Sequence, residues 1–253
     1  MIRALRGLGG AFAYYTVLPA GRFASDEAPD VAAFEWLPVV GAVVGAIAGL
    51  TAYGAFAWLG APWSFVLAWA LLIGLTGAIH FDGFLDGCDA LFATVTPQRR
   101  LEILRDVHHG TYAVVGMAIV AAFGLTALAA IAPARYPLVL AFTGSAARLA
   151  VLPTAWIFPY ARRDGMARTF AAPPGLAAAM LNLVVVEAIA WFVTPWAAAL
   201  ALAWTGILAH GLVDSPYWKN DLSVEWWALA ALVVVAVVPA TRQLQLRRPF
   251  RHS

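Results

Sequence analysis

The sequence predicts an all-α protein, a polytopic bundle of about seven transmembrane helices that forms a single integral membrane domain over residues 1–253. Of its residues, 62% are hydrophobic and 12% are charged, whereas soluble domains are about half apolar and a quarter charged. The apolar residues form blocks of about 20, the length that crosses a bilayer. Arginines cluster between these blocks, as they do in cytoplasmic loops. We therefore expect a multi-pass protein of the cell (inner) membrane, with the lipid bilayer as a partner.

The hydrophobic blocks give the expected spans. Residues 1–19 form a shorter apolar segment, expected to lie in the interface or to re-enter it. Gly41, Gly45 and Gly49 recur at every fourth position, a spacing that lets two helix backbones approach closely. The spans are expected at 36–59, 63–81, 112–132, 136–158, 174–194, 196–213 and 226–240.

Charge orients this bundle. The 94–111 and 160–173 loops hold several arginines, whereas the linkers near 60–62 and 194–195 hold none. Arginine-rich loops stay in the cytoplasm, so the end of the second span should face the cytoplasm too. The net charge of +2 is too small to suggest a nucleic-acid partner, and the single cysteine, Cys88, excludes an internal disulfide.

Residues 97–109 are expected to form an amphipathic helix on the membrane surface. Thr96 is a suitable N-cap, Pro97 suits the first helical position and Gly110 is a natural stop. Glu102 and Asp106 are four residues apart and would share one face. A plain surface connector is the alternative interpretation.

The stretch HFDGFLDGCDALF (80–92) places three aspartates directly after an uncharged apolar run. If the second span continues as a helix through residue 92, Asp82, Asp86 and Asp89 fall within about 60° of one another. Like charges on one partly desolvated face repel each other, so a bound cation would stabilise them. Oxygen ligands favour Mg²⁺, which binds through one or two carboxylates plus substrate phosphates. Three solvated carboxylates without a metal are the alternative.

The arginine-bearing loops on the same side predict an anionic, phosphate-containing ligand. A metal-bridged diphosphate attacked by an alcohol needs carboxylates for the metal, cations for the leaving group and activation of the hydroxyl. The pattern therefore predicts an Mg²⁺-dependent membrane phosphotransferase with a nucleotide-activated substrate. CDP-alcohol phosphotransferases use a comparable aspartate stripe.

Two runs, GAIHFDGFLDGCDALFA (77–93) and RRLEILRDVHHGTYAVVG (99–116), resemble the cobalamin synthase family, adenosylcobinamide-GDP ribazoletransferase. The runs TVLP (16–19), LPVVGAVVG (37–45) and YARRDGM (160–166) resemble further family motifs in the same order. The resemblance implies that adenosylcobinamide-GDP is joined to α-ribazole or its 5′-phosphate, the final assembly of the nucleotide loop. Adenosylcobalamin or its 5′-phosphate and GMP would be the products, and Mg²⁺ the cofactor, at the cytoplasmic membrane face.

The resemblance also implies roles for individual residues. Asp82, Asp86 and Asp89 would hold Mg²⁺ on the diphosphate, with Asp89 also a catalytic candidate. Glu102 and Asp106 would complete the metal shell or accept the ribazole hydroxyl proton. Arg148 is a charge in mid-span, which usually faces a site or a partner. The expected contacts to substrate or phosphate are His80, Arg105, Arg148, Arg162 and Arg163.

This chain departs from the family pattern at two places. The family's D-S-R is DVH (106–108) here, and the glycine-rich motif near the C-terminus is not visible. One alternative is a CDP-alcohol-type phosphotransferase with another acceptor, although Asp86–Gly87 stand where that family has Ala-Arg. The other is a transporter, although no internal repeat is evident. A homo-oligomer is compatible with the sequence.

Overall fold

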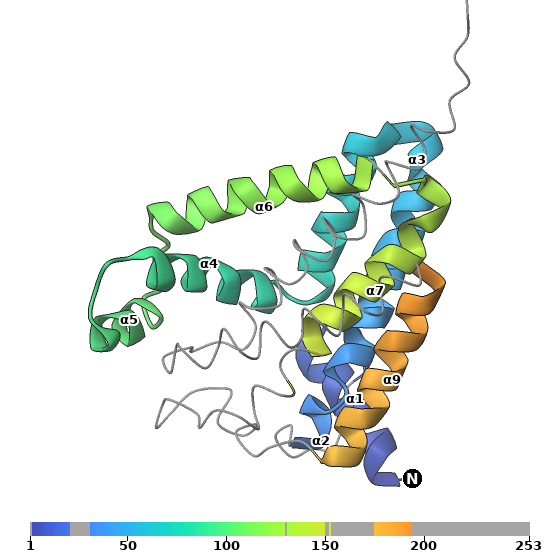
Figure 1. Ribbon diagram of the computed structural model, residues 1–253, viewed down its shortest axis with the longest axis horizontal. Helices are drawn as coiled ribbons and strands as arrows, with labels where there is room; N and C mark the ends of the chain where they lie inside the picture. Colours follow the sequence, from blue (N-terminus) through green and yellow to red (C-terminus); the bar gives the residue numbers. More distant parts are fainter. Residues whose placement is uncertain (1, 21–30, 130, 150–151, 153–174, 194–253) are drawn as a thin grey trace, which may run out of the picture.

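The computed structural model describes residues 2–20, 31–129, 131–149, 152 and 175–193, and every element in these ranges is helical (Figure 1). The predicted all-α class is therefore confirmed for this part of the chain. The expected spans 196–213 and 226–240 lie outside the described residues. So do residues 150–151 and 153–158 of the expected span 136–158. The elements are α1 (Ile2–Tyr15), α2 (Val31–Phe34), α3 (Leu37–Leu75), α4 (Ile79–Phe92), α5 (Pro97–Ile103), α6 (Thr111–Ala129), η2 (Pro133–Arg135), α7 (Tyr136–Leu149) and α9 (Leu176–Val193).

Helix α3 folds back on itself at Gly60. This glycine has φ 73° and ψ 175°, a conformation open to glycine alone, and Pro62 follows it. The ribbon turns at the top of Figure 1, and Ala48 of the first arm shares a core with Ala68 of the second. In the described ranges α3 is the helix whose length and apolarity suffice for crossing a membrane; α6 and α9 contain shorter apolar stretches. The two arms correspond to the first two expected spans.

The second span, expected at 63–81, does not continue as one helix through residue 92, the condition from which the aspartate spacing was derived. Helix α3 ends at Leu75, and Gly77 and Ala78 have φ values of 58° and 60°. Two successive left-handed residues cannot continue a right-handed helix, so α4 begins anew at Ile79. At this break the Val17 N–H donates a hydrogen bond to the Leu75 carbonyl at 2.8 Å, which attaches the segment after α1 to the end of α3.

Glycines bring the backbones of α3 and α7 into contact. A Cβ atom on Gly41 would meet the carbonyl oxygen of Gly144, and a Cβ on Gly45 would meet that of Leu140. A Cβ on Gly49 would lie 2.5 Å from Pro137 Cα. The predicted close approach of helices at this glycine repeat is therefore confirmed.

The remaining helices form two groups around α3. Helices α1, α7 and α9 pack against its first arm, with Val44, Phe142 and Val186 in their common core. Helices α4 and α6 run side by side away from this group, and α5 lies at their far end (Figure 1). Between α4 and α6, the buried thiol of Cys88 packs against Gly116.

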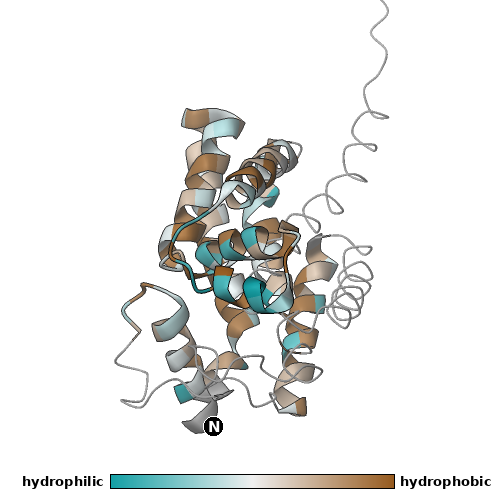
Figure 2. Cartoon of the chain, turned by 90° about the vertical axis from the view of Figure 1, so that its left-hand side faces the viewer, coloured by the Kyte–Doolittle hydropathy of each residue, from teal (hydrophilic) through white to brown (hydrophobic). Residues whose placement is uncertain are grey.

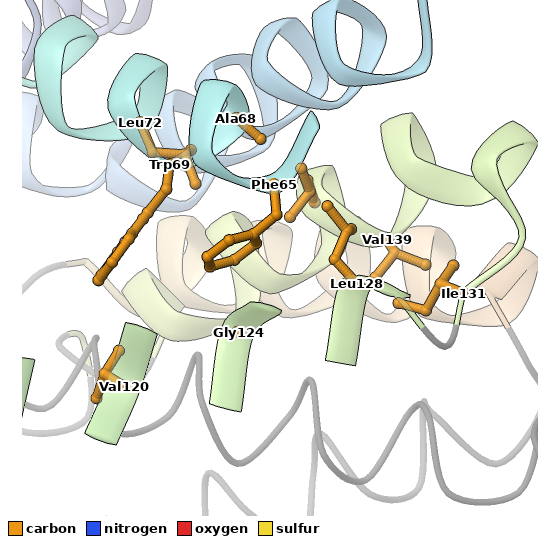
Figure 3. Close-up of a pocket in the computed structure, with 10 residues that line it drawn as sticks. Phe65, Ala68, Trp69, Leu72, Val120, Gly124, Leu128, Ile131 and Val139 are labelled. Atoms are coloured by element: carbon orange, nitrogen blue, oxygen red, sulfur yellow. The ribbon is translucent and has the colours of Figure 1, made fainter. Parts of the chain in front are cut away.

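An apolar pocket of about 50 Å³ lies between the second arm of α3, α6 and α7 (Figure 3). In Figure 3 the rings of Phe65 and Trp69 point from α3 towards the strip of α6 that contains Val120 and Gly124. All ten lining residues are apolar. This pocket therefore lacks the charged groups that a diphosphate would need.

We predict that Gly45→Ala destabilises the protein by about 1–3 kcal/mol, because its new methyl group must displace the α7 backbone. The matched control is Gly54→Ala in the same helix, where a Cβ would meet nothing within 4 Å. Thermal unfolding of the detergent-solubilised protein should show a lower midpoint for Gly45→Ala and no loss for Gly54→Ala. Equal midpoints for the two variants would contradict the assigned packing.

Candidate active site at the open end of helix α4

Helix α4 presents its three aspartates on one face. Ile79–Phe92 is continuous, so Asp82, Asp86 and Asp89 keep the predicted spacing. The Asp82 side chain is 66% exposed, whereas Asp86 and Asp89 are both buried, each with 9% of its surface exposed. The stripe thus runs from solvent into the protein.

Asp89 holds the start of α6. Its Oδ2 accepts a hydrogen bond from the Gly110 N–H at 2.5 Å, and its Oδ1 accepts one from the Ala113 N–H at 3.0 Å. Backbone donors at a helix start favour a carboxylate partner. A Cβ at position 110 would lie 2.8 Å from Asp89 Oδ1, so a side chain there would push the Asp89 carboxylate out of place. The loop before α6 is thereby fixed over the aspartate face.

This loop places His109 beside the other two aspartates. The His109 Nε2 atom lies 3.6 Å from Asp82 Oδ1, and Nδ1 lies 3.8 Å from Asp86 Oδ1. The histidine side chain is 35% exposed. The sequence analysis did not identify this residue. The sequence alone does not place His109 near the aspartates, because this placement depends on the hydrogen bond between Gly110 and Asp89.

The amphipathic helix is shorter than predicted. Helix α5 begins as expected, since Thr96 Oγ1 accepts a hydrogen bond from the Arg99 N–H at 3.4 Å, but it ends at Ile103 instead of near residue 109. Beyond it, Asp106 Oδ1 accepts from the backbone N–H of His108 at 3.0 Å and lies 2.8 Å from its Nδ1. Such side-chain bonds compete with the helix. The shared helical face expected for Glu102 and Asp106 is therefore wrong.

The same contacts keep Asp106 ionised. The hydrogen bond with the His108 side chain, followed by the one from its backbone N–H, lowers the pKa of Asp106 below its ordinary value. Asp106 is consequently a weak proton acceptor but a constant negative charge at neutral pH. Glu102 pairs with Arg99 at 2.6 Å on the exposed surface, and Arg105 is exposed in the following loop. Figure 2, seen from the α5 side, shows hydrophilic residues gathered here between apolar helices.

The structure places His80 and Arg148 away from the aspartate face. On α4, His80 lies about 120° to 180° from the three aspartates. Its buried ring stacks on that of Tyr15 with centroids 6.2 Å apart. Arg148 is an electrostatic neighbour of His80, and its Nη1 donates to the Gly144 carbonyl at 2.9 Å. Two predicted phosphate contacts are thus buried together on the opposite side of α4, and the other two, Arg162 and Arg163, lie outside the described residues.

The aspartate face offers oxygen donors suited to a hard cation. Asp82 and Asp86 are one turn apart, and Asp89 uses both oxygens for backbone N–H groups. Within the described ranges, no group of three or more His, Cys, Asp or Glu side chains is arranged to hold an ion. Two carboxylates still fit Mg²⁺, because this ion commonly takes its remaining ligands from substrate phosphates and water.

The chain is similar in sequence to known proteins over much of its length. The chain is 40% identical over 178 residues to adenosylcobinamide-GDP ribazoletransferase of Bradyrhizobium diazoefficiens, covering 67% of this chain and 66% of the relative. Proteins of the same name match in Azorhizobium caulinodans, with 33% identity and 72% of each chain covered, and in Deinococcus radiodurans, with 35% identity and 62% and 57% covered. No solved structure matches significantly.

A sequence profile of the family described as cobalamin-5-phosphate synthase matches residues 7–238. The match extends beyond the motifs quoted from the sequence and includes all of α3 to α9. The resemblance inferred from the aspartate run and the segment after it is thereby confirmed: the chain belongs to the cobalamin-5-phosphate synthase family.

Proposed function

We propose that this protein joins adenosylcobinamide-GDP to α-ribazole or α-ribazole 5′-phosphate, releasing GMP and forming adenosylcobalamin or its 5′-phosphate. The family and the names of the relatives indicate this final step of nucleotide-loop assembly. The observation that most directly supports the chemistry is the pair Asp82 and Asp86, which lies under a fixed loop beside an arginine-bearing surface. A divalent ion needs carboxylates, and the diphosphate that it binds needs cationic side chains, so both kinds of charge must lie close together.

In this reaction the hydroxyl oxygen of ribazole forms a bond to the phosphorus attached to cobinamide, and the bond from that phosphorus to the GMP oxygen breaks. Asp82 and Asp86 would hold Mg²⁺, which when bound neutralises charge on the diphosphate. Asp89 acts through the loop, since its oxygens are occupied by backbone N–H groups. The exposed Arg105 would contact phosphate, with Arg162 and Arg163 as further candidates.

The proton of the attacking hydroxyl needs an acceptor. Glu102 and Asp106 are the candidates from the family pattern. The lowered pKa of Asp106 makes it a weaker base than an ordinary aspartate. We assign the buried pair His80 and Arg148 a supporting role on the inner side of α4, where Arg148 brings positive charge close to the helix with the aspartates.

We further propose that the protein is a multi-pass protein of the cell (inner) membrane, with about seven spans and its active site on the cytoplasmic face. The apolar hairpin α3, with exposed Trp58 and Trp63 beside its bend, supports this arrangement because tryptophan prefers the membrane interface. The arginines of α5 and the following loop favour the cytoplasmic side for the aspartates.

Cysteine labelling tests this orientation. In a Cys88→Ala background, Val107→Cys should react with a membrane-impermeant maleimide only in inverted vesicles, because the loop lies on the cytoplasmic side. Ala61→Cys, beside the bend of α3, should react only in intact cells. Labelling of both positions from the same side would rule out a membrane-crossing α3 hairpin.

Loss of either of the two carboxylates assigned to the metal, Asp82 or Asp86, should abolish turnover. We expect Asp82→Asn and Asp86→Asn to insert and fold but to release no detectable GMP, because the ion loses one of two protein ligands. The assay supplies adenosylcobinamide-GDP, α-ribazole 5′-phosphate and Mg²⁺ to membranes and follows GMP and the corrinoid product, with EDTA as a further control. Glu35→Gln is the matched control, since its amide oxygen can still accept from Gly175 N–H. Full activity in either aspartate variant would refute the metal assignment.

Substitutions at Asp89 and Gly110 should have non-additive effects on kcat, because both break the same contact. Gly110→Ala pushes the carboxylate aside, and Asp89→Asn leaves one acceptor oxygen where two are used. Each variant should lower kcat by about tenfold or more, and the double variant should be no worse than the more impaired single variant. Multiplicative losses in this double-mutant cycle would show that the two residues act independently.

A further inference from the structure

Two aromatic side chains lie at the end of the aspartate face of α4. Phe92 follows Asp89 by three residues, so it lies about 60° from this aspartate around the helix and nearly one turn further along. Its ring contacts that of Tyr112 on α6, with centroids 6.3 Å apart and planes tilted by 41°. Phe92 is nevertheless 52% exposed and Tyr112 is 48% exposed. We call this pair the aromatic shelf, because it presents ring surface beside the site.

The aromatic shelf is held in place by the contacts that fix the start of α6. Tyr112 lies in the first turn of α6, and the backbone on either side of it donates two hydrogen bonds to the Asp89 carboxylate. On α4, Phe92 lies about 40° from Cys88, whose thiol packs against α6. The shelf therefore borders the aspartate face at the end where α4 and α6 are bonded together.

The spacing along α4 suits a nucleoside. Phe92 comes six residues after Asp86, which is about 9 Å along the helix axis. This length is comparable to that of a nucleoside, measured from its sugar hydroxyls to the outer edge of its base. A nucleoside whose hydroxyl reaches a diphosphate held at Asp86 would therefore bring its base to the shelf. Stacking on aromatic side chains is a common way to bind such a base.

Two nucleosides take part in the proposed reaction, the guanosine of the GDP group and α-ribazole. The edges of guanine carry hydrogen-bond donors and acceptors, which need polar partners when they are bound. The base of α-ribazole is a benzimidazole, and its outer edge is hydrocarbon. The shelf offers aromatic carbon, and the segments after α4 and α5 add the exposed apolar side chains of Val95 and Val107. This chemistry favours α-ribazole.

The order of the elements favours the same occupant. Glu102 and Asp106, the candidates for accepting the ribazole proton, belong to α5 and the loop that follows it. This segment comes after Phe92 and before Tyr112, and α5 lies at the same end of the α4–α6 pair as the shelf (Figure 1). The attacking nucleoside should therefore approach the diphosphate from this end.

We propose that Tyr112 and Phe92 form the subsite for the base of α-ribazole, with the Tyr112 ring as the main stacking surface. The inference rests on the proposed function, because it names the side chains that recognise the acceptor of that reaction. Stacking orients the nucleoside, so that its hydroxyl oxygen faces the phosphorus that it attacks. A tyrosine that only anchors α6 at the membrane interface would leave the affinity for substrates unchanged.

The test measures the two substrates separately. Membrane assays determine the KM of α-ribazole 5′-phosphate and that of adenosylcobinamide-GDP, each with the other substrate saturating. Equilibrium dialysis of the purified full-length protein in detergent gives the Kd of α-ribazole 5′-phosphate without turnover. We expect Tyr112→Leu to raise this KM and Kd about tenfold, because one stacking contact is lost. The KM of adenosylcobinamide-GDP should stay unchanged. Phe92→Leu should act in the same direction, and Tyr112→Phe should retain the native values.

Tyr53→Leu is the matched control, because Tyr53 is 49% exposed on the first arm of α3. It should leave all constants unchanged. Turnover with unchanged constants for α-ribazole 5′-phosphate in Tyr112→Leu, or a raised KM of adenosylcobinamide-GDP instead, would overturn the subsite and leave the proposed function intact. A native protein that neither binds α-ribazole 5′-phosphate nor releases GMP would overturn both. Equal unfolding midpoints of the variants establish that each is folded.

Discussion

The bond between the Asp89 carboxylate and the backbone of Gly110 and Ala113 is the contact on which the site depends. Between these residues the chain leaves α4, forms the short helix α5 and returns to start α6. Without that bond the returning segment would be held against α4 by the packing of α6 alone. With it, one carboxylate caps a helix, leaves little room for a side chain at residue 110 and leaves Asp82 and Asp86 as the aspartates not bonded to the α6 backbone. A single buried acidic residue thus places the returning segment beside the acidic face of α4.

The sequence predicts the helical framework well because its causes are local. The arms of α3, together with α6 and α9, follow from apolar blocks, and the glycine repeat correctly predicts where backbones meet. The aspartate stripe is also local, since spacing alone places Asp82, Asp86 and Asp89 on one helix face. The family could be identified for the same reason: its motifs are short, contiguous and in order.

The errors arise where side chains compete with the backbone or where distant segments meet. The break at Gly77 and Ala78 has no strong sequence signal, because alanine ordinarily favours a helix. Helix α5 ends early because the Asp106 carboxylate bonds to His108, an effect that a hydrophobic pattern does not include. The separation of His80 from the aspartates follows from helical spacing and could have been predicted. The position of His109 could not, because it requires a contact over 21 residues between Asp89 and Gly110.

The bend at Gly60 has a consequence for the synthesis of the protein. Because α3 reverses there, the segment after α1 reaches the end of α3, where Val17 bonds to Leu75 and Tyr15 stacks on His80. Helix α1 leaves the ribosome before these partners, which are made some 60 residues later. In the proposed membrane arrangement, α1 therefore reaches this position only after the α3 hairpin has been inserted. Its short length allows this delay, since 14 residues do not commit a helix to cross the bilayer by itself.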